Sequence, residues 1–346
     1  MPKLNINLFL DDEYDDVRQI VKPKRRLAKS KASHRPKGTT QQIVAELAAQ
    51  SDEIETHNFT YRASRHERAW MMDSLGGFYE QQWFDDVLRL VKGGKEASVY
   101  QCLGNATSGA RFLAAKIYRP RMFRNLRKDH LYREGRSNLD SDGNEITEDG
   151  MLNAMRKRSK YGLQLLHTSW LAYEYKALQI LHAAGGDVPI VYASSDNCIL
   201  MEYIGGEDLA APTLNEVQLE RQEALALFVR ALKNIEIMLA NNLVHADLSA
   251  YNILYWQGQI KLIDFPQAIH PDQNRNSYQI FERDVTRICE YFARQGVPSR
   301  PRKIATDMWT AYNRRLGPDV HPALLDDQDE GDRLYWDKLV KGRSNG

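Results

Sequence analysis

The pattern of apolar and polar residues predicts a set of short strands. Stretches rich in β-branched and aromatic residues alternate with turns that contain glycine. One such turn, Gln257-Gly258, joins the two strands of an expected β-hairpin. We expect strands over residues 86–91, 98–103, 111–118, 189–193, 198–203, 252–256 and 259–263.

Apolar residues spaced three and four positions apart predict helices between and after these strands. The capping box Ser64-x-x-Glu67 is expected to begin the first helix, and the pair Gly76-Gly77 is expected to end it. Further helices are expected over 161–182, 278–295 and 301–315.

A second capping box, Thr213-x-x-Glu216, is expected to begin another long helix. The apolar stripe of that helix is expected to comprise Leu225, Phe228, Leu232, Ile235 and Leu239. Because strands mostly precede helices and one long helix separates two groups of strands, the pattern predicts an α+β protein with two lobes.

Composition adds limits on class and location. The chain has 346 residues, of which 42% are apolar and 27% are charged, which is typical of a folded globular protein. It contains no apolar run long enough for a membrane helix and no apolar leader at its start, so we expect neither a membrane partner nor secretion. Three distant cysteines give no metal-binding or disulfide spacing, and we expect a cytoplasmic protein.

The formal net charge of +1 hides blocks of opposite sign. Basic residues gather in segments 18–37 and 121–136, where they indicate either a solvated face or contacts with RNA phosphates. We expect residues 1–45 to form a mobile charged tail and 119–159 to form a flexible loop, because regular patterns fail in both. The remaining boundaries are 46–204 for N-terminal helices and an N-lobe, and 205–346 for a reduced C-lobe and a C-terminal tail.

The segment His245-x-Asp247-x-x-x-x-Asn252, followed by Asp264 after an apolar strand, has the residue types that phosphoryl transfer requires. One carboxylate orients the attacking group, while an amide and a second carboxylate hold Mg²⁺ against the phosphates. The predicted hairpin would bring Asn252 and Asp264 to the same end. The alternative is a surface turn in which Asp and Asn act as caps, and the apolar strands make it the weaker interpretation.

Two segments of the predicted N-lobe could bind phosphates. The first is a glycine-containing turn between strands, in which the candidate nucleotide-binding residues are Gly94, Lys95, Glu96, Ala97, Ser98 and Val99. The second is Lys116, which lies within an apolar strand and therefore needs a carboxylate partner. Glu174, on the helix predicted over 161–182, is the candidate partner. The alternatives are an ordinary hairpin turn and a lysine that reaches solvent from an edge strand.

An apolar strand that runs into Gly205-Gly206 is typical of a connector between lobes. Backbone groups of Glu202 and Ile204 could bond an adenine edge there, although a buried strand that ends in a turn would look the same.

Four segments together resemble the RIO family of atypical protein kinases, and they are closest to its type 1 branch. They are Gly-Lys-Glu-Ala-Ser-Val-Tyr (94–100), Lys-Ile-Tyr-Arg (116–119), His-Ala-Asp-Leu-Ser-Ala-Tyr-Asn (245–252) and Ile-Asp-Phe-Pro-Gln-Ala (263–268). The similarity spans roughly residues 65–295 with the motifs in order. The chain departs from the family pattern at Ala250, Phe265 and Pro266, which bears on subfamily and partners more than on catalysis and would also fit a bacterial relative.

The resemblance implies a two-lobed protein-kinase-like fold with a minimal C-lobe, and a serine/threonine kinase or ATPase that uses ATP with Mg²⁺ or Mn²⁺. Asp247 would be the catalytic aspartate, and Asn252 and Asp264 the metal ligands, with Asp264 also the site of a phospho-aspartate. Lys116 would hold the phosphates with Glu174 as its partner, and Met201 would be the gatekeeper. The implied partners are a protein substrate, the chain itself, or a precursor of the small ribosomal subunit.

Two other functions stay open at this point. A small-molecule phosphotransferase of the aminoglycoside or choline kinase type shares the catalytic pattern but needs a large C-terminal pocket. Since Asp284 follows Asp264 closely and the chain ends at residue 346, little room remains for such a pocket or for a peptide platform. The second alternative is an RNA- or ribosome-binding assembly factor gated by nucleotide. Asp284 itself either braces the catalytic loop or is a charge at a helix N-terminus.

Overall fold

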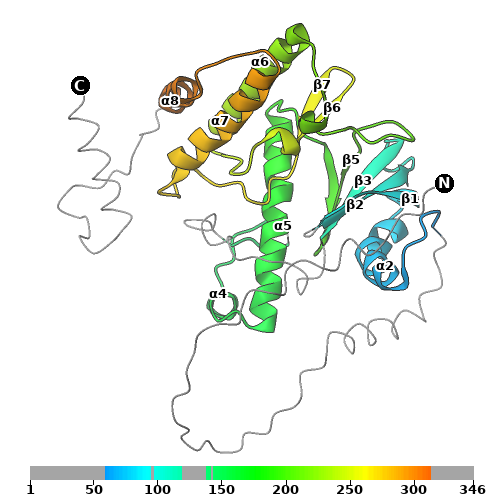
Figure 1. Cartoon of the computed structure of the whole chain (residues 1–346). Coiled ribbons are helices and arrows are strands. Elements are labelled where there is room, and N and C mark those ends of the chain that lie inside the picture. Colours follow the sequence, from blue (N-terminus) through cyan, green and yellow to red (C-terminus); the bar gives the residue numbers. More distant parts are fainter. Residues whose placement is uncertain (1–58, 95–96, 119–137, 142, 313–346) are drawn as a thin grey trace, which may run out of the picture. The chain divides into compact units, whose positions relative to one another are not determined.

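The computed structural model describes residues 59–94, 97–118, 138–141 and 143–312. Its N-terminal lobe is built on an antiparallel five-stranded sheet with the order β1-β2-β3-β5-β4 (Figure 1). The strands are β1 (Phe84–Gly93), β2 (Ala97–Gly104), β3 (Phe112–Tyr118), β4 (Val191–Ser194) and β5 (Cys198–Glu202). All five coincide with predicted strands to within a few residues at their ends.

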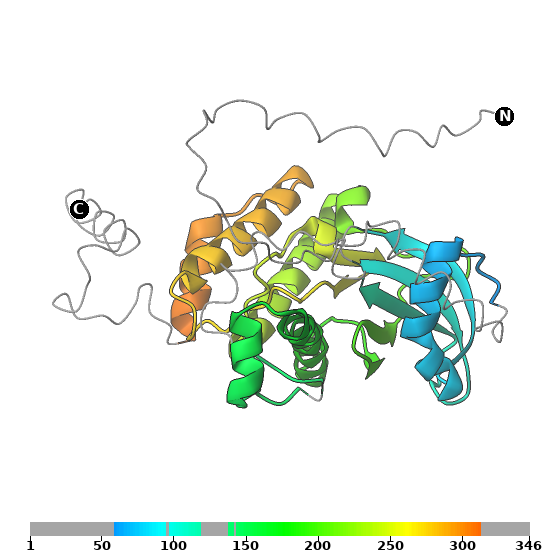
Figure 2. The same cartoon turned by 90° about the horizontal axis from the view of Figure 1, so that it is seen from below.

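The alternation of side chains along β3 gives the sheet two different faces. Leu113, Ala115 and Ile117 are buried in the cluster that includes helix α2 (Arg65–Glu80). Ala114 and Tyr118 point the other way, into a cluster with Trp170 of helix α5 (Lys160–Ala183). Figure 2 shows α2 and α5 on opposite faces of the sheet. The same alternation places Lys116 on the α5 face.

Helix α2 begins where it was predicted but does not end there. The Ser64 side chain accepts a hydrogen bond from the Glu67 N–H, whereas the Glu67 carboxylate accepts from the hydroxyls of Tyr61 and Tyr100, at 3.0 and 2.7 Å. The prediction that Gly76-Gly77 ends the helix is wrong, because the helix continues to Glu80. Phe78, which follows the glycines, is buried in the same cluster, so packing outweighs the low helix propensity of glycine.

The segment predicted as a flexible loop over 119–159 contains regular structure in its described part. Helix α4 (Asp149–Arg156) lies there, and Leu139 pairs with Glu145 in an isolated bridge. The Leu139 N–H also donates to the Ser169 hydroxyl on α5 at 2.9 Å. The expectation of an unstructured loop is therefore wrong for residues 149–156, which form a short helix that buries Met155. Residues 119–137 lie outside the described part.

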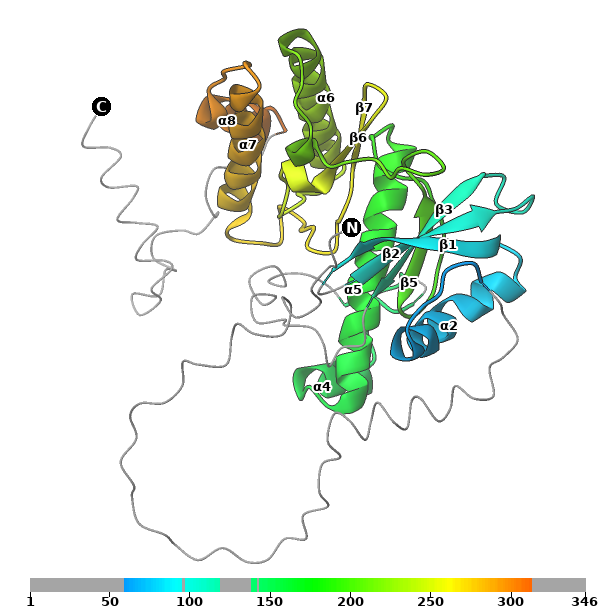
Figure 3. The ribbon, with the colours of Figure 1, turned by 45° about the vertical axis from the view of Figure 1, so that its right-hand side comes forward.

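The second lobe consists of helices and one β-hairpin. Its elements are α6 (Arg221–Ala240), η5 (Ala250–Asn252), β6 (Ile253–Trp256), β7 (Gln259–Leu262), α7 (Ser277–Arg294) and α8 (Pro301–Ala311). Figure 3 shows the β6–β7 hairpin between α6 and the larger sheet. The predicted hairpin, the two lobes and the α+β class are confirmed.

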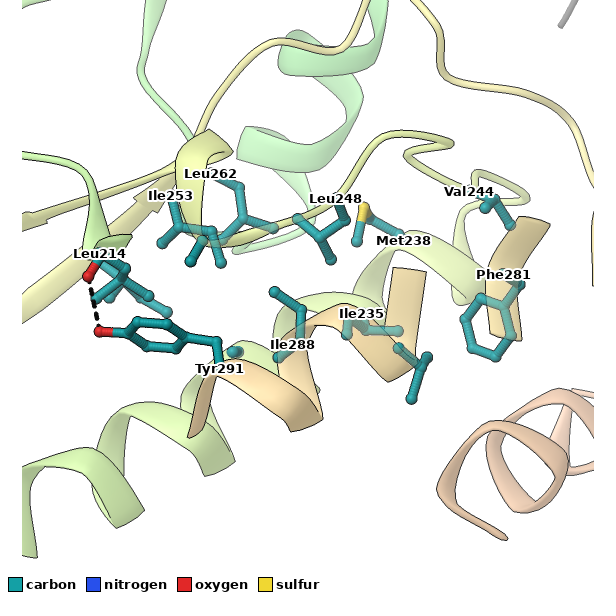
Figure 4. Packing of buried hydrophobic residues seen from close by; sticks show 14 of the residues in the cluster. Leu214, Ile235, Met238, Val244, Leu248, Ile253, Leu262, Phe281, Ile288 and Tyr291 are labelled. Atoms are coloured by element: carbon teal, nitrogen blue, oxygen red, sulfur yellow. Dashed lines mark hydrogen bonds between the residues drawn. The ribbon is translucent and has the colours of Figure 1, made fainter. Parts of the chain in front are cut away.

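The long helix α6 starts later than predicted. The Thr213-Glu216 capping box is present, but it caps a short 3-10 helix, η4 (Leu214–Glu216), and α6 begins at Arg221. Phe228, Ile235 and Leu239 are buried as expected, whereas Leu225 is 53% exposed and does not belong to the stripe. Figure 4 shows Ile235 and Met238 of α6 packed near Ile288 of α7 and Leu248 of the loop between α6 and β6.

Among the described residues, no helix combines the length and the apolar character that a bilayer crossing requires.

Candidate active site

The segment that carries the predicted catalytic residues is a loop closed at its base. Val244 and Ile269 exchange two backbone hydrogen bonds of 2.9 Å, and the hairpin β6–β7 lies between them. At the open end of the hairpin, away from its Gln257-Gly258 turn, the Ile263 N–H donates to the Asn252 carbonyl at 3.0 Å. Asn252 and Asp264, which are distant in sequence, are therefore brought to neighbouring positions, as the hairpin predicted.

His245 anchors this loop from inside. Its side chain is buried, its Nε2 lies 3.0 Å from the Ile263 carbonyl, and the Asp247 N–H donates to its Nδ1 at 3.3 Å. The pattern assigns the proton to Nε2, and burial lowers the pKa of His245, which favours this neutral form. The ring also packs on Phe265 with centroids 4.5 Å apart. His245 therefore links the strand that precedes Asp264 to the turn that carries Asp247.

Asn252 stabilises the same turn. Its Nδ2 donates to the Asp247 backbone carbonyl at 2.9 Å. Since the amide nitrogen is engaged in this way, the amide oxygen of Asn252 points away from that carbonyl and is left as an acceptor. The Asp247 carboxylate is 47% exposed and can therefore meet a substrate from solvent.

Lys116 joins three elements through two ion pairs. Its Nζ lies 2.6 Å from Glu174 Oε1 on α5 and 2.8 Å from Asp264 Oδ1 after β7. The predicted contact between Lys116 and Glu174 is thus present, and Asp264 is a second partner. We call Lys116, Glu174 and Asp264 the charged triad.

Burial and charge act against each other in the charged triad. The side chain of Lys116 is 12% exposed and that of Glu174 is 1% exposed, while that of Asp264 is 44% exposed. Burial favours neutral Lys116, but Asp264 and Glu174 outweigh it and raise the lysine pKa. Burial raises the pKa of Glu174, whereas the Lys116 ammonium overcomes burial to lower the pKa of Asp264. The exposed member of the triad is therefore held as a carboxylate.

Outside the hairpin turn that contains Gln257, the backbone of this loop is strained at two positions. Ala246 has φ 66° and Asp264 has φ 71°, although neither is glycine. Each such conformation costs roughly 1–2 kcal/mol, and it persists only where surrounding contacts enforce it. The strain falls on Asp264 itself and on the residue before Asp247, which fixes the direction of both side chains.

Helix α7 braces the loop from below. Arg283 donates to the Ala246 carbonyl and, at 3.1 Å, to the Asp284 carboxylate. Asp284 is buried, and burial raises its pKa to about 7, against the opposing effects of Arg283, the Leu248 backbone and Arg287. Asp284 thus lies against the catalytic loop, as one of the two sequence interpretations expected.

The glycine turn between β1 and β2 is narrow at its base. The Gly94 N–H donates to the Ala97 carbonyl at 2.9 Å, and a Cβ on Gly94 would come within 2.9 Å of the same oxygen. Ser98 is buried and Ala97 and Val99 are partly buried in the strand that follows. Lys95 and Glu96, at the tip, lie outside the described residues.

The connector between the lobes offers fewer free backbone groups than predicted. The Glu202 N–H donates to the Ile190 carbonyl at 2.7 Å, and the Ile204 carbonyl accepts from the Ala211 N–H at 3.0 Å. Within the described residues no hydrogen bond uses the Ile204 N–H, which remains a donor for a base. Met201, the expected gatekeeper, is 7% exposed on β5.

The structure adds two arginines that the sequence did not indicate. Arg287 of α7 donates to Asp247 Oδ1 at 3.0 Å. Arg89 of β1 bonds to the Tyr203 hydroxyl at 2.9 Å and to Gln101 at 2.6 Å, so it fastens the sheet to the connector. Arg287 lies on the same helix as Asp284, three residues on, and this spacing is the only signal that could have identified it.

The residues present fit a divalent cation. The amide oxygen of Asn252 and the carboxylate of Asp264 are hard oxygen donors at neighbouring positions. No group of three or more His, Cys, Asp or Glu side chains suited to a metal occurs in the described part of the chain. Mg²⁺ is usually held by one or two protein oxygen ligands together with substrate phosphates.

A two-lobed α+β fold with a lysine held between two carboxylates and a closed Asp/Asn loop is the architecture of a kinase. The chain belongs to the RIO domain family, whose model matches residues 98–304. The match agrees with the type 1 branch of the family. Members of the family in general use ATP, with a divalent metal, to phosphorylate a protein substrate.

Related proteins carry names of the same kind. The RIO-type serine/threonine-protein kinase Rio1 of Thermoplasma acidophilum is 28% identical over 204 residues, which are 58% of this chain and 94% of that protein. The Haloferax volcanii protein of the same name is 29% identical, covering 60% of this chain and 63% of its own length. Serine/threonine-protein kinase RIO1 of Chaetomium thermophilum is 25% identical, over 86% of this chain and 53% of its own length.

Proposed function

We propose that this protein transfers the γ-phosphoryl group of ATP to a serine or threonine hydroxyl of a protein, or to its own Asp264. Support comes from the position of Lys116, whose ammonium lies within 2.8 Å of Asp264 while Glu174 holds it from behind. The same lysine can therefore bind phosphate oxygens next to the residue that would hold the metal.

In the transfer to a hydroxyl, Asp247 orients the attacking group. The hydroxyl oxygen forms a bond to the γ-phosphorus, the bond to the β–γ bridging oxygen breaks, and its electron pair leaves with ADP. The hydroxyl proton passes to the Asp247 carboxylate. Asn252 and Asp264 would hold Mg²⁺ or Mn²⁺, which would neutralise charge on the phosphate oxygens. Lys116 neutralises further charge, and the Ile204 N–H would bind the base.

In the second route, a carboxylate oxygen of Asp264 attacks the γ-phosphorus and forms an acyl phosphate as ADP leaves. Asp264 is suited to this because its side chain is 44% exposed and the neighbouring lysine keeps it ionised. Its pairing with Lys116 uses only Oδ1, so Oδ2 is the oxygen that would attack.

The acceptor is tested by incubating the full chain with γ-labelled ATP and Mg²⁺. Label on protein that is stable to hydroxylamine supports a serine or threonine acceptor, and label that hydroxylamine removes supports Asp264. Asp264→Asn should abolish the second kind of label, and Asp196→Asn, an exposed carboxylate on the β4–β5 turn, serves as control. Label that appears only on an added amine or sugar would favour a small-molecule phosphotransferase instead.

We further propose a ribosomal role, in which the kinase acts on a precursor of the small ribosomal subunit. The basic segments 18–37 and 121–136 would bind RNA phosphates, and both lie outside the described residues. RNA affinity should fall as salt rises and should weaken when residues 1–45 are deleted. Binding that survives this deletion unchanged would contradict a role for segment 18–37.

The cytoplasm is our proposed location. Cys102, Cys198 and Cys289 are buried free thiols, which is the state that a reducing compartment maintains. Loss of activity in reducing buffer, with recovery on oxidation, would contradict it.

A further inference from the structure

The positive charge next to the Asp247 carboxylate does not come from the loop that carries Asp247. Residues 245–252 contain no lysine or arginine. The cation that contacts the Asp247 carboxylate is Arg287, whose Nη1 lies 3.0 Å from Oδ1. The two side chains are 40% and 47% exposed, so the pair faces the solvent from which a nucleophile would approach.

Helix α7 fixes the place of Arg287. One turn earlier on the same helix face, Arg283 bonds the Ala246 carbonyl and Asp284 lies buried beneath the loop. The backbone of α7 is thus tied to the residue that precedes Asp247. Arg287 therefore approaches the carboxylate from a rigid support.

Lys116, the cation of the charged triad, is engaged elsewhere in the site. Lys116 is already shared between Glu174 and Asp264, and the three charges of that triad sum to a negative value. Arg287 binds one oxygen of the Asp247 carboxylate and so fixes the direction of the other. Correct orientation of the group that accepts the proton lowers the barrier to transfer.

We propose that Arg287 is a positioning residue of the transfer site: it holds Asp247 by Oδ1 so that Oδ2 meets the attacking hydroxyl. The inference rests on the proposed function. In that step the hydroxyl oxygen bonds to the γ-phosphorus, ADP leaves with the electron pair of the bridging oxygen, and Asp247 Oδ2 accepts the proton. Because Arg287 acts on the nucleophile side, it affects the rate of transfer and leaves nucleotide affinity unchanged.

The test compares Arg287→Gln, Arg287→Lys and Arg287→Ala in the full chain with wild type. The rate of label transfer from γ-labelled ATP and the Kd for ADP with Mg²⁺ are measured on each. We expect Arg287→Gln to lower the rate about 10- to 100-fold with less than about a twofold change in Kd. Arg287→Lys should keep more of the rate, and guanidinium ion added at millimolar concentration should partly restore Arg287→Ala.

Arg294→Gln removes the same charge from an exposed position of the same helix and should match wild type. A rate for Arg287→Gln within about twofold of the Arg294→Gln control would overturn the inference while leaving the proposed function intact. An equal loss of rate and nucleotide affinity, without rescue by guanidinium, would also overturn it. A wild-type protein without transfer would overturn both.

Discussion

The two charged regions of the site differ in how they are exposed to water. The charged triad buries Lys116 and Glu174 and leaves only Asp264 open, while Asp247 and Arg287 are both about half exposed. The triad connects β3, α5 and the segment after β7, whereas the second pair connects one loop to one helix.

This difference in exposure indicates two roles: the charged triad supports the fold and binds phosphates, and the Asp247–Arg287 pair sets the rate of transfer. A buried lysine with two carboxylates is costly to assemble and costly to break, so it supports the fold as well as binding phosphates. A half-exposed pair contributes little to stability because water screens it, and its value lies in the direction it gives to Asp247. We therefore expect changes in the triad to alter stability and nucleotide binding, and changes in the pair to alter the rate.

The largest effect is expected at the exposed end of the triad. Asp264→Asn should lower phosphoryl transfer by about 10³-fold or more, because the metal and the phosphates lose a charged ligand. The Kd for ATP with Mg²⁺ should rise, and calorimetric titration measures it. Asp196→Asn should behave as wild type. A rate for Asp264→Asn close to that of this control would contradict a role for the charged triad in metal and phosphate binding.

The next effect is on stability. Lys116→Met leaves the Glu174 carboxylate buried without its cation and should lower the free energy of unfolding by about 3–5 kcal/mol in urea titrations. The double variant Lys116→Met with Glu174→Leu removes both charges and should recover most of that loss without regaining activity. If the single and double variants prove equally stable, Glu174 is not held by Lys116 in the way described.

The brace beneath the catalytic loop should give a pH dependence. Asp284 has a folded pKa of about 7, above the ordinary value of about 3.9, so between these values the folded state binds more protons than the unfolded state. The free energy of unfolding should therefore fall as pH rises from 5 to 7, by about 2 kcal/mol relative to Asp284→Asn. Arg283, Arg287 and His245 are the charged or titratable groups beside it. A difference between the two proteins that stays constant over this pH range would contradict the assignment.

The smallest effect is expected for an ion pair outside both regions. Arg111 and Glu207 pair on the surface with side chains 71% and 62% exposed. Arg111→Gln should change the free energy of unfolding by less than about 1 kcal/mol and leave transfer unchanged. A larger loss of stability would show that the exposure of an ion pair does not determine how much it stabilises the fold. That result would weaken the comparison of the charged triad with the Asp247–Arg287 pair.

The sequence predicts most of what depends on local pattern. The apolar run around Lys116 predicts a strand, and an unpaired lysine among apolar residues requires a carboxylate, which leads to Glu174. The same reasoning fails for Arg287, because nothing in the local sequence of a helix indicates that one of its arginines pairs with Asp247, which is distant in the chain. The capping box at Thr213 misleads for a related reason: local hydrogen bonds begin a helical turn, but only tertiary packing decides whether the turn continues.

The most direct test of these two separate roles is a single-turnover titration with γ-labelled ATP and Mg²⁺, which yields both the nucleotide Kd and the rate of transfer. It should be run on Asp264→Asn and Asp247→Asn beside wild type. We predict that Asp247→Asn loses the rate while its Kd stays within about twofold of wild type, and that Asp264→Asn loses both rate and affinity. An Asp247→Asn protein that binds nucleotide as poorly as Asp264→Asn, or that still transfers label at the wild-type rate, would contradict it.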